Sequence, residues 1–207
     1  MNLYKKIFYK KKILIYGMGK TGFSSYKYLR KNNQIFLYDD NKNIFNKKIL
    51  KKLLLNKNKI HQSKFDFILI SPGININNCD LKNYLKKNLK KIITDLDIFY
   101  SNHSKNMIIT ITGTNGKSTT AKLLNLILKD HKKDSRLCGN IGNPILSQKK
   151  ISKKTLFVVE ASSYQIAYSK FFKTNYAVIL NISPDHLERH GSIEKYVSAK
   201  FKLITNI

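Results

Sequence analysis

The 207-residue sequence has no tryptophan, three prolines and two cysteines. Cys79 and Cys138 stand apart, without the CxxC or histidine spacing of a metal site, and two thiols in a chain of this size do not form a disulfide framework. Long apolar runs are absent as well. The run after the basic start is broken at Lys10–Lys12, and no run has the length of about 20 residues that a membrane span needs. We therefore expect a cytoplasmic protein in a reducing compartment, with neither signal peptide nor membrane anchor.

Acidic residues are scarce: 12 Asp and Glu stand against 39 Lys and Arg, which gives a net charge of +27. Such a charge is typical of proteins that bind nucleic acid or anionic membranes. The lysines, however, are scattered through the whole chain among many Asn, Ile and Tyr residues, and a coding bias toward these residues produces the same totals. We favour a solvated basic surface and expect no nucleic-acid or membrane partner. A non-catalytic, basic nucleic-acid-binding fragment stays open as an alternative.

Short apolar runs that end in Gly, Pro, Asn or Asp alternate with longer amphipathic stretches, which predicts βαβ units and an α/β fold with mainly parallel sheets. The hydrophobic content of 42% suffices for one large or two small domains. The expected strands are Lys12–Tyr16, Gln34–Tyr38, Phe65–Ile70, Lys91–Thr94, Met107–Thr112, Thr155–Val159 and Ala177–Asn181. The expected helices lie near Gly22–Lys31, Asn41–Asn58, Asp80–Leu89 and Thr120–Lys129.

A polar segment, Ser101–Asn106, divides these elements into two series. The sequence thus predicts a Rossmann-like domain over residues 1–100 and a P-loop-type α/β domain over residues 101–207.

The strongest motif is an apolar strand that runs into Gly113-Thr114-Asn115-Gly116-Lys117-Ser118-Thr119 and then into a helical pattern. A strand, loop and helix in this order direct backbone N–H groups and a helix N-terminus at a phosphate. Lys117 would meet the β- and γ-phosphates of ATP, and Ser118 or Thr119 would offer a hydroxyl to Mg²⁺. The spacing departs from the general phosphate-loop pattern, because Ile111 stands where the first glycine is usual.

Two further apolar runs end in groups that bind metals. Thr155–Val159 leads into Glu160, and Tyr176–Leu180 leads into a segment that holds Asp185 and His186. Open α/β sheets bind ligands at the carboxyl ends of their strands. Three such strand ends together predict a site for phosphate and metal, with Glu160 as a Mg²⁺ ligand.

The segment Gly17–Gly22 follows the first strand with the GxGxxG spacing, and Asp39 and Asp40 follow the second strand. This pattern is typical of dinucleotide binding and taken alone suggests an NAD-dependent oxidoreductase. Its physical requirement is a diphosphate at a helix N-terminus and an acid near a ribose or base, and a UDP group meets that requirement equally. Ser71-Pro72-Gly73 adds a turn with free N–H groups beside the same place.

Taken together, the motifs resemble the Mur ligases of peptidoglycan synthesis, and among them the D-glutamate-adding member. The resemblance is carried in the family's order by seven segments: Gly17–Gly22, Ser71–Ile74, Thr112–Thr119, Gly139–Gly142, Glu160–Gln165, Asn181–His186 and Tyr196–Lys200. A phosphate loop without the first glycine is the family's own form. The NAD reading, by contrast, leaves Gly113–Thr119 unexplained.

The resemblance implies an ATP-dependent amide ligase of peptidoglycan precursor synthesis that works through an acyl phosphate. It implies that Lys117 neutralises the γ-phosphate, that Ser118 and Glu160 hold one Mg²⁺, and that His186 holds a second. Lys200 matches a lysine that such ligases carry as a metal-bridging carbamate. Asn140 and Ser162 would line the substrate, UDP-N-acetylmuramoyl-L-alanine, which is joined to D-glutamate. The UDP group would be held by Lys20, Thr21, Asp39, Ser71, Pro72 and Gly73.

Two departures from the family stand out. Thr94–Phe99 differs mildly from the family's usual sequence in a segment that we expect to pack between the domains. The chain is also about half as long as a three-domain ligase, whose last part contributes to the D-glutamate and adenine sites. We therefore expect a monomeric chain that binds ATP or the UDP-sugar weakly and does not ligate by itself.

Overall fold

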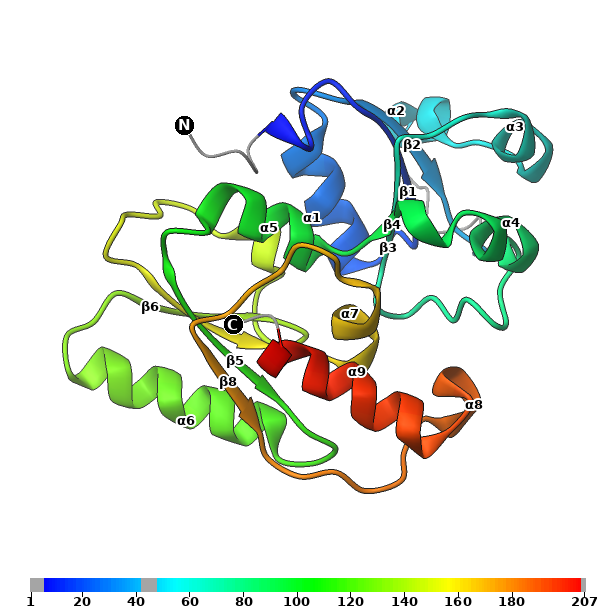
Figure 1. Cartoon of the computed structure of the whole chain (residues 1–207). Coiled ribbons are helices and arrows are strands. Elements are labelled where there is room, and N and C mark those ends of the chain that lie inside the picture. The colour runs from blue at the N-terminus through cyan, green and yellow to red at the C-terminus, as the bar shows by residue number, and fades with distance from the viewer. Residues whose placement is uncertain (1–5, 42–47, 206–207) are drawn as a thin grey trace.

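The computed structural model describes residues 6–41 and 48–205, which form two parallel four-stranded sheets with helices around them (Figure 1). The first sheet has the order β2-β1-β3-β4, and the second has the order β6-β7-β5-β8. Every pairing is parallel. The predicted α/β class with parallel sheets is confirmed. In the described ranges, no helix is both long and apolar enough to cross a membrane.

In the first sheet, the central strand β1 (Lys12–Tyr16) is apolar on both faces because helices cover it on both sides. Its neighbours are β2 (Gln34–Tyr38) and β3 (Phe67–Ile70), and β4 (Ile92–Ile93) forms the edge. The connecting helices are α1 (Lys20–Leu29), α2 (Lys48–Leu53), α3 (Lys57–Gln62) and α4 (Lys82–Lys87), followed by the short 3-10 helix η3 (Leu89–Lys91).

Some predicted boundaries in this half were wrong. Strand β3 begins at Phe67 and not at Phe65, because the Asp66 carboxylate accepts the Lys12 N–H and ends the ladder there. Helix α1 begins two residues before Gly22. Within the helix expected over 41–58, residues 42–47 lie outside the described part, and Asn56 caps a separate helix, α3.

The polar segment Ser101–Asn106 is not a linker along its whole length, since α5 (Asp95–His103) continues through its first half. The helix starts early because Thr94 and Asp97 form a capping box, with the Thr94 N–H 2.9 Å from Asp97 Oδ2. The end of the segment is also anchored, because the buried Asn106 side chain donates to the Ser152 and Thr155 carbonyls. A division into domains at residue 100 remains a proposal.

The second sheet consists of β5 (Met107–Thr112), β6 (Ser135–Gly139), β7 (Leu156–Glu160) and β8 (Tyr176–Ile179). The long helix α6 (Lys117–Asp130) covers one face, and it begins three residues before and ends one residue after the predicted range Thr120–Lys129. Strand β6 and four helical segments were not predicted: η4 (Ile145–Ser147), α7 (Ser163–Tyr168), α8 (Leu187–His190) and α9 (Ile193–Thr205). Strands β7 and β8 are displaced by one residue from their predicted starts.

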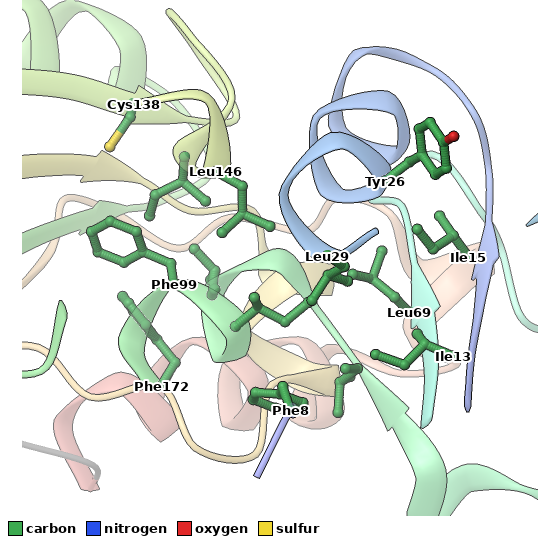
Figure 2. Packing of buried hydrophobic residues seen from close by; sticks show 14 of the residues in the cluster. Phe8, Ile13, Ile15, Tyr26, Leu29, Leu69, Phe99, Cys138, Leu146 and Phe172 are labelled. Carbon is green, nitrogen blue, oxygen red and sulfur yellow. The ribbon is translucent and has the colours of Figure 1, made fainter. Parts of the chain in front are cut away.

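One apolar core connects the two sheets. It includes Ile13 and Ile15 of β1 together with Phe157 and Val159 of β7, all essentially inaccessible to solvent. Phe99 of α5 lies in this core and packs edge-on against Phe157 at a centroid distance of 4.7 Å. Figure 2 shows side chains from α1 and β1 on one side of this core and from β6 and η4 on the other. The two sheets are therefore joined through α1, α5 and η4, which pack together in this core.

Buried polar contacts of α5 reinforce this packing. Asp97 Oδ1 accepts the Ser169 hydroxyl at 2.8 Å and the N–H groups of Lys170, Phe171 and Phe172 at 2.7, 2.7 and 3.2 Å. Asp97 is completely buried. The expectation that Thr94–Phe99 packs between the two halves is confirmed by these contacts.

A glycine substitution tests the close approach of α1 to β1. A Cβ at Gly22 would lie 1.8 Å from the Gly17 carbonyl oxygen, so α1 must move away from the sheet in Gly22→Ala. We expect a loss of more than about 2 kcal/mol in the free energy of unfolding, measured by urea denaturation. Gly19→Ala is the matched control, because a Cβ at Gly19 meets nothing within 4 Å. Equal losses in the two variants would contradict this account.

Candidate functional site

The phosphate loop connects β5 to α6, and the Asn181 side chain bonds to it at three points. Asn181 Oδ1 accepts the N–H groups of Thr114 and Asn115 at 3.1 and 2.9 Å, while its Nδ2 donates to the Asn115 carbonyl at 3.1 Å. Gly116 precedes the helix with φ +81°, in the left-handed region that favours glycine. The loop is thus held open in the shape that presents the N-terminus of α6, which has Ser118 and Thr119 in its first turn.

Two lysine ammonium groups converge on the start of this loop. Lys117 Nζ lies 2.9 Å from the Gly113 carbonyl oxygen and 2.6 Å from that of Thr114. Lys200 Nζ, from α9, lies 2.8 Å from the same Gly113 oxygen. Lys200 is 1% exposed, and burial together with the charge of Lys117 lowers its pKa to about 8. The site therefore concentrates positive charge where an anion would be bound.

A buried carboxylate lies at the end of β7. Glu160 is 2% exposed; its Oε2 accepts the Ser118 hydroxyl at 2.8 Å, and its Oε1 accepts the Asn140 amide at 3.1 Å. A carboxylate beside a hydroxyl is the hard oxygen set that suits Mg²⁺, which takes its other ligands from phosphate and water. The described residues contain no group of three His, Cys, Asp or Glu side chains that could hold a metal by themselves. This donor set fits an ion that is shared with a phosphate ligand.

Lys117, Lys200 and Asn140 border a cavity of about 300 Å³ that has walls from both halves of the chain. Ser118 and Glu160 do not line this cavity, but Glu160 bonds to Asn140, which does. We call it the central cavity. Its lining includes many of the predicted site residues: Pro72, Gly73, Gly113, Lys117, Asn140, Ser162, His186 and Lys200. His186 is half-exposed and has its Nε2 3.4 Å from Asp185 Oδ2. Predicted residues from the turn after β3, from the phosphate loop and from the segments that follow β6, β7 and β8 thus meet at this cavity.

Four predicted substrate residues do not line this cavity. Ser71 Oγ donates to the Gly17 carbonyl at 2.6 Å, and Asp39 accepts the N–H groups of Met18 and Asn41 at 2.6 and 2.9 Å. Both side chains thus hold the turn that begins at Gly17. Lys20 lines a separate cleft of about 730 Å³ between α1 and the segment 143–149, and Thr21 is in the first turn of α1. The roles of these residues toward a substrate stay predictions.

Arg189 is not among the predicted site residues, yet its side chain reaches the turn at Pro72. A signal was present, because only three of the 39 basic residues are arginine. Where lysine serves nearly everywhere, an arginine marks a place that needs several donors in a fixed plane. Asn181 and Tyr164 were also not identified as parts of the site, although both stand inside the quoted motifs.

Asp95 at the start of α5 provides a test by pH. Its Oδ1 accepts the Gln165 amide at 3.1 Å, its Oδ2 is buried without a hydrogen-bond partner, and burial raises its pKa from 3.8 to about 6. The folded state therefore binds the proton more tightly than the unfolded state, so this group favours folding below about pH 4 and that contribution is lost as the pH rises through 6.

We expect Asp95→Asn to remove this dependence. Between pH 7 and pH 4, the free energy of unfolding of the wild type should rise relative to that of the variant by up to about 3 kcal/mol. Urea denaturation of both proteins across this range gives the difference directly. Parallel pH profiles would show that the Asp95 carboxyl has an ordinary pKa in the folded protein.

The fold and the central cavity define a class of protein: a parallel α/β protein with a strand–loop–helix phosphate motif beside a buried carboxylate. Comparison with known families makes this specific. Residues 111–207 match the Mur ligase middle domain, and residues 11–93 match the Mur ligase MurD-like N-terminal domain. The chain belongs to the Mur ligase family.

Several curated relatives bear the name UDP-N-acetylmuramoylalanine--D-glutamate ligase. The protein of Rickettsia bellii is 39% identical over 94% of this chain and 43% of its own length, and that of Rickettsia prowazekii is 37% identical over 98% and 45%. The protein of Caldicellulosiruptor saccharolyticus is 35% identical over 95% of this chain and 46% of its own length. The chain thus spans somewhat less than half the length of these relatives.

Solved structures agree on the fold. The UDP-N-acetylmuramate:L-alanyl-gamma-D-glutamyl-meso-diaminopimelate ligase of Neisseria meningitides superposes with a TM-score of 0.57 at 16% identity, covering 96% of this chain and 68% of that one. UDP-N-acetylmuramate-alanine ligase of Thermotoga maritima gives 0.51 at 22% identity, covering 95% and 47%. At such identities the likeness concerns the arrangement of helices and strands.

Proposed function

We propose that the chain carries the ATP-binding and UDP-substrate-binding part of a ligase that adds D-glutamate to UDP-N-acetylmuramoyl-L-alanine in peptidoglycan precursor synthesis. The observation that carries this proposal is the central cavity, in which Lys117, Lys200 and Asn140 face Pro72 and Gly73 of the other half. A ligase must bring a nucleotide phosphate and a substrate carboxylate into contact. A cavity between a phosphate loop and a second sheet provides that arrangement.

ATP would be bound by the loop Gly113–Gly116 and the N-terminus of α6. Lys117 now contacts loop carbonyls and would turn to the γ-phosphate, because a charged oxygen is a stronger acceptor than a carbonyl. Ser118 and Glu160 would hold Mg²⁺ beside that phosphate. The ion would supply positive charge where negative charge develops during phosphoryl transfer to the substrate carboxylate. The D-glutamate amine would then attack the acyl carbon of the resulting acyl phosphate, which forms the amide bond and releases phosphate and a proton.

Lys200 would act in a modified form. Carbamate formation joins a neutral amine to CO₂ and releases a proton, so it requires a lysine that loses its proton near neutral pH. Burial and Lys117 lower the pKa of Lys200 to about 8, which supports this chemistry. The carbamate would replace a cation by an anion next to Lys117 and would bind a second Mg²⁺ with His186.

The substrate would lie across the boundary between the two sheets. Asn140 and Ser162 would contact its muramoyl-alanine end, and Pro72 and Gly73 would form the opposite wall. Its diphosphate would rest at the N-terminus of α1, near Lys20 and Thr21, in a turn that Asp39 and Ser71 hold in shape. All proposed partners are small molecules, the proposed compartment is the cytoplasm, and the proposed state is a monomer.

Titration calorimetry on the purified 207-residue chain tests the proposal. We expect binding of ATP that requires Mg²⁺ and binding of UDP-N-acetylmuramoyl-L-alanine that is stronger than binding of UDP-N-acetylglucosamine. NADH is the control ligand, and its nicotinamide fluorescence should not change on addition of the chain. Quenching of NADH fluorescence without binding of the UDP-sugar would replace the proposal by an oxidoreductase.

A further inference from the structure

Arg189 of α8 contacts the turn that follows β3 in the other half of the chain. Its Nη2 donates to the carbonyl oxygens of Pro72 and Ile74 at 3.0 and 2.6 Å, although Pro72 and Arg189 are 117 residues apart in sequence. The contact is reciprocal, because Asn77 Nδ2 donates to the Arg189 carbonyl at 3.0 Å. Two hydrogen bonds therefore join this turn to α8, and a third joins α8 to Asn77, three residues after the turn.

The guanidinium group is held in place from the other side by an aromatic ring. Its Cζ lies 3.4 Å from the centroid of the Tyr164 ring. The His190 ring stacks on Tyr164 at a centroid distance of 4.9 Å and an interplanar angle of 12°, and its Nε2 lies 2.9 Å from Ser163 Oγ. Stacking and hydrogen bonding together fix the plane of the guanidinium group. A lysine ammonium group has no such plane and could not be held in the same way.

The groups joined by Arg189 belong to opposite walls of the central cavity. Pro72 and Gly73 form one wall, and Ser163 and Tyr164 lie on the other. Among the described residues, no carboxylate lies within ion-pair distance of Arg189. The guanidinium group thus directs its charge at the backbone carbonyls of the turn. Because the same group stacks on Tyr164, Arg189 connects the two walls of the central cavity.

We propose that Arg189 is a positioning residue that holds the Pro72–Ile74 turn, and with it the bound UDP-linked substrate, in register with Lys117 and Lys200. The identity of that substrate rests on the proposed function. The positioning of the turn rests only on the contacts of Arg189.

Hydrogen exchange measured by mass spectrometry on the 207-residue chain tests the positioning. The Ile74 N–H bonds to the Ser71 carbonyl at 3.0 Å and reports on the shape of the turn. In Arg189→Lys, which keeps the charge but loses the planar fork, exchange in peptides over 71–78 should be at least about tenfold faster. Peptides over 113–119 and 156–160 should exchange as in the wild type.

Arg136→Lys is the matched control, because Arg136 of β6 pairs with Asp134, which precedes the strand, at 2.8 Å and does not line the central cavity. It should leave exchange over 71–78 unchanged. If all peptides of the Arg189→Lys variant exchanged faster, Arg189 would have a general role in stability. If exchange over 71–78 were unchanged in this variant, Arg189 would have no role in holding the turn. Either result overturns the proposal.

Ligand binding then separates this proposal from the proposed function. Arg189→Lys should bind UDP-N-acetylmuramoyl-L-alanine about tenfold more weakly than the wild type and should bind ATP equally well. Equal affinity of both proteins for the UDP-sugar would overturn the positioning of substrate. Failure of the wild type itself to bind the UDP-sugar, with the local change in exchange present, would refute the proposed function and leave the turn positioned by Arg189.

Discussion

Lys117→Ala should lower the affinity of the chain for ATP by about a hundredfold. The Lys117 ammonium group lies at the mouth of the loop with two carbonyl contacts, and no other cation except Lys200 contacts the Gly113 carbonyl in the described part of the chain. A charged hydrogen bond to a phosphate contributes about 1.5–3 kcal/mol, and the upper end applies where the group is partly buried. Titration with ATP and Mg²⁺ measures the change.

Lys122→Ala is the control for this prediction, because Lys122 is exposed one turn further along the same helix. It should bind ATP as the wild type does, and both variants should unfold at nearly the same urea concentration. If the two substitutions weakened ATP binding to the same extent, the effect would belong to the general positive charge of the chain. The nucleotide would then not be bound at this loop.

Asp97→Ala should give the largest loss of stability, about 4 kcal/mol in the free energy of unfolding. The substitution leaves the N–H groups of Lys170, Phe171 and Phe172 without their acceptor inside the protein, and it also removes the capping bond to Thr94. Buried donors without partners cost about 1–3 kcal/mol each, and their costs are not additive because the segment can relax. Urea denaturation at neutral pH measures the loss.

Asp97→Asn should be less harmful than Asp97→Ala, because the Asn amide oxygen can still accept from the 169–172 segment while its NH₂ group faces the Thr94 N–H. Asp130→Ala is the control for removal of a carboxylate, since Asp130 is exposed at the end of α6. Its stability should stay within about 0.5 kcal/mol of the wild type. A small loss in Asp97→Ala would mean that the two halves are held together by the apolar core alone.

The sequence predicted best three strands that are continuous apolar runs between turn residues. The bounds of β1, β2 and β5 agree with the prediction because continuous apolar runs between turn residues leave little choice. Strand β6 was missed because Arg136 interrupts its pattern, and its burial depends on pairing with β7. Helix α9 was not predicted because its buried face includes Lys200, and a lysine interrupts the apolar pattern by which a buried helix face is recognised in a sequence.

The residues of the site were easier to predict than their contacts. Glycine spacing and strand-end acids identify Lys117, Ser118 and Glu160, since local geometry fixes where such residues point. The contact of Arg189 with Pro72 depends on how two sheets pack, and no local pattern encodes a contact between residues 117 positions apart. The same reason explains why the hydrogen bonds from residues 169–172 to Asp97 were not predicted, although its segment was expected to pack between the domains.

The apolar core that joins the two sheets has a consequence for the energetics of ligand binding. Because Phe99 and Phe157 pack in one core with Ile13 and Ile15, the walls of the central cavity are already aligned without a ligand. A ligand that bridges two independently moving bodies must restrict their relative motion, and the lost entropy reduces its affinity. Here that restriction is built into the folded chain, so the entropy lost on binding is confined to the ligand and to the few side chains that turn toward it.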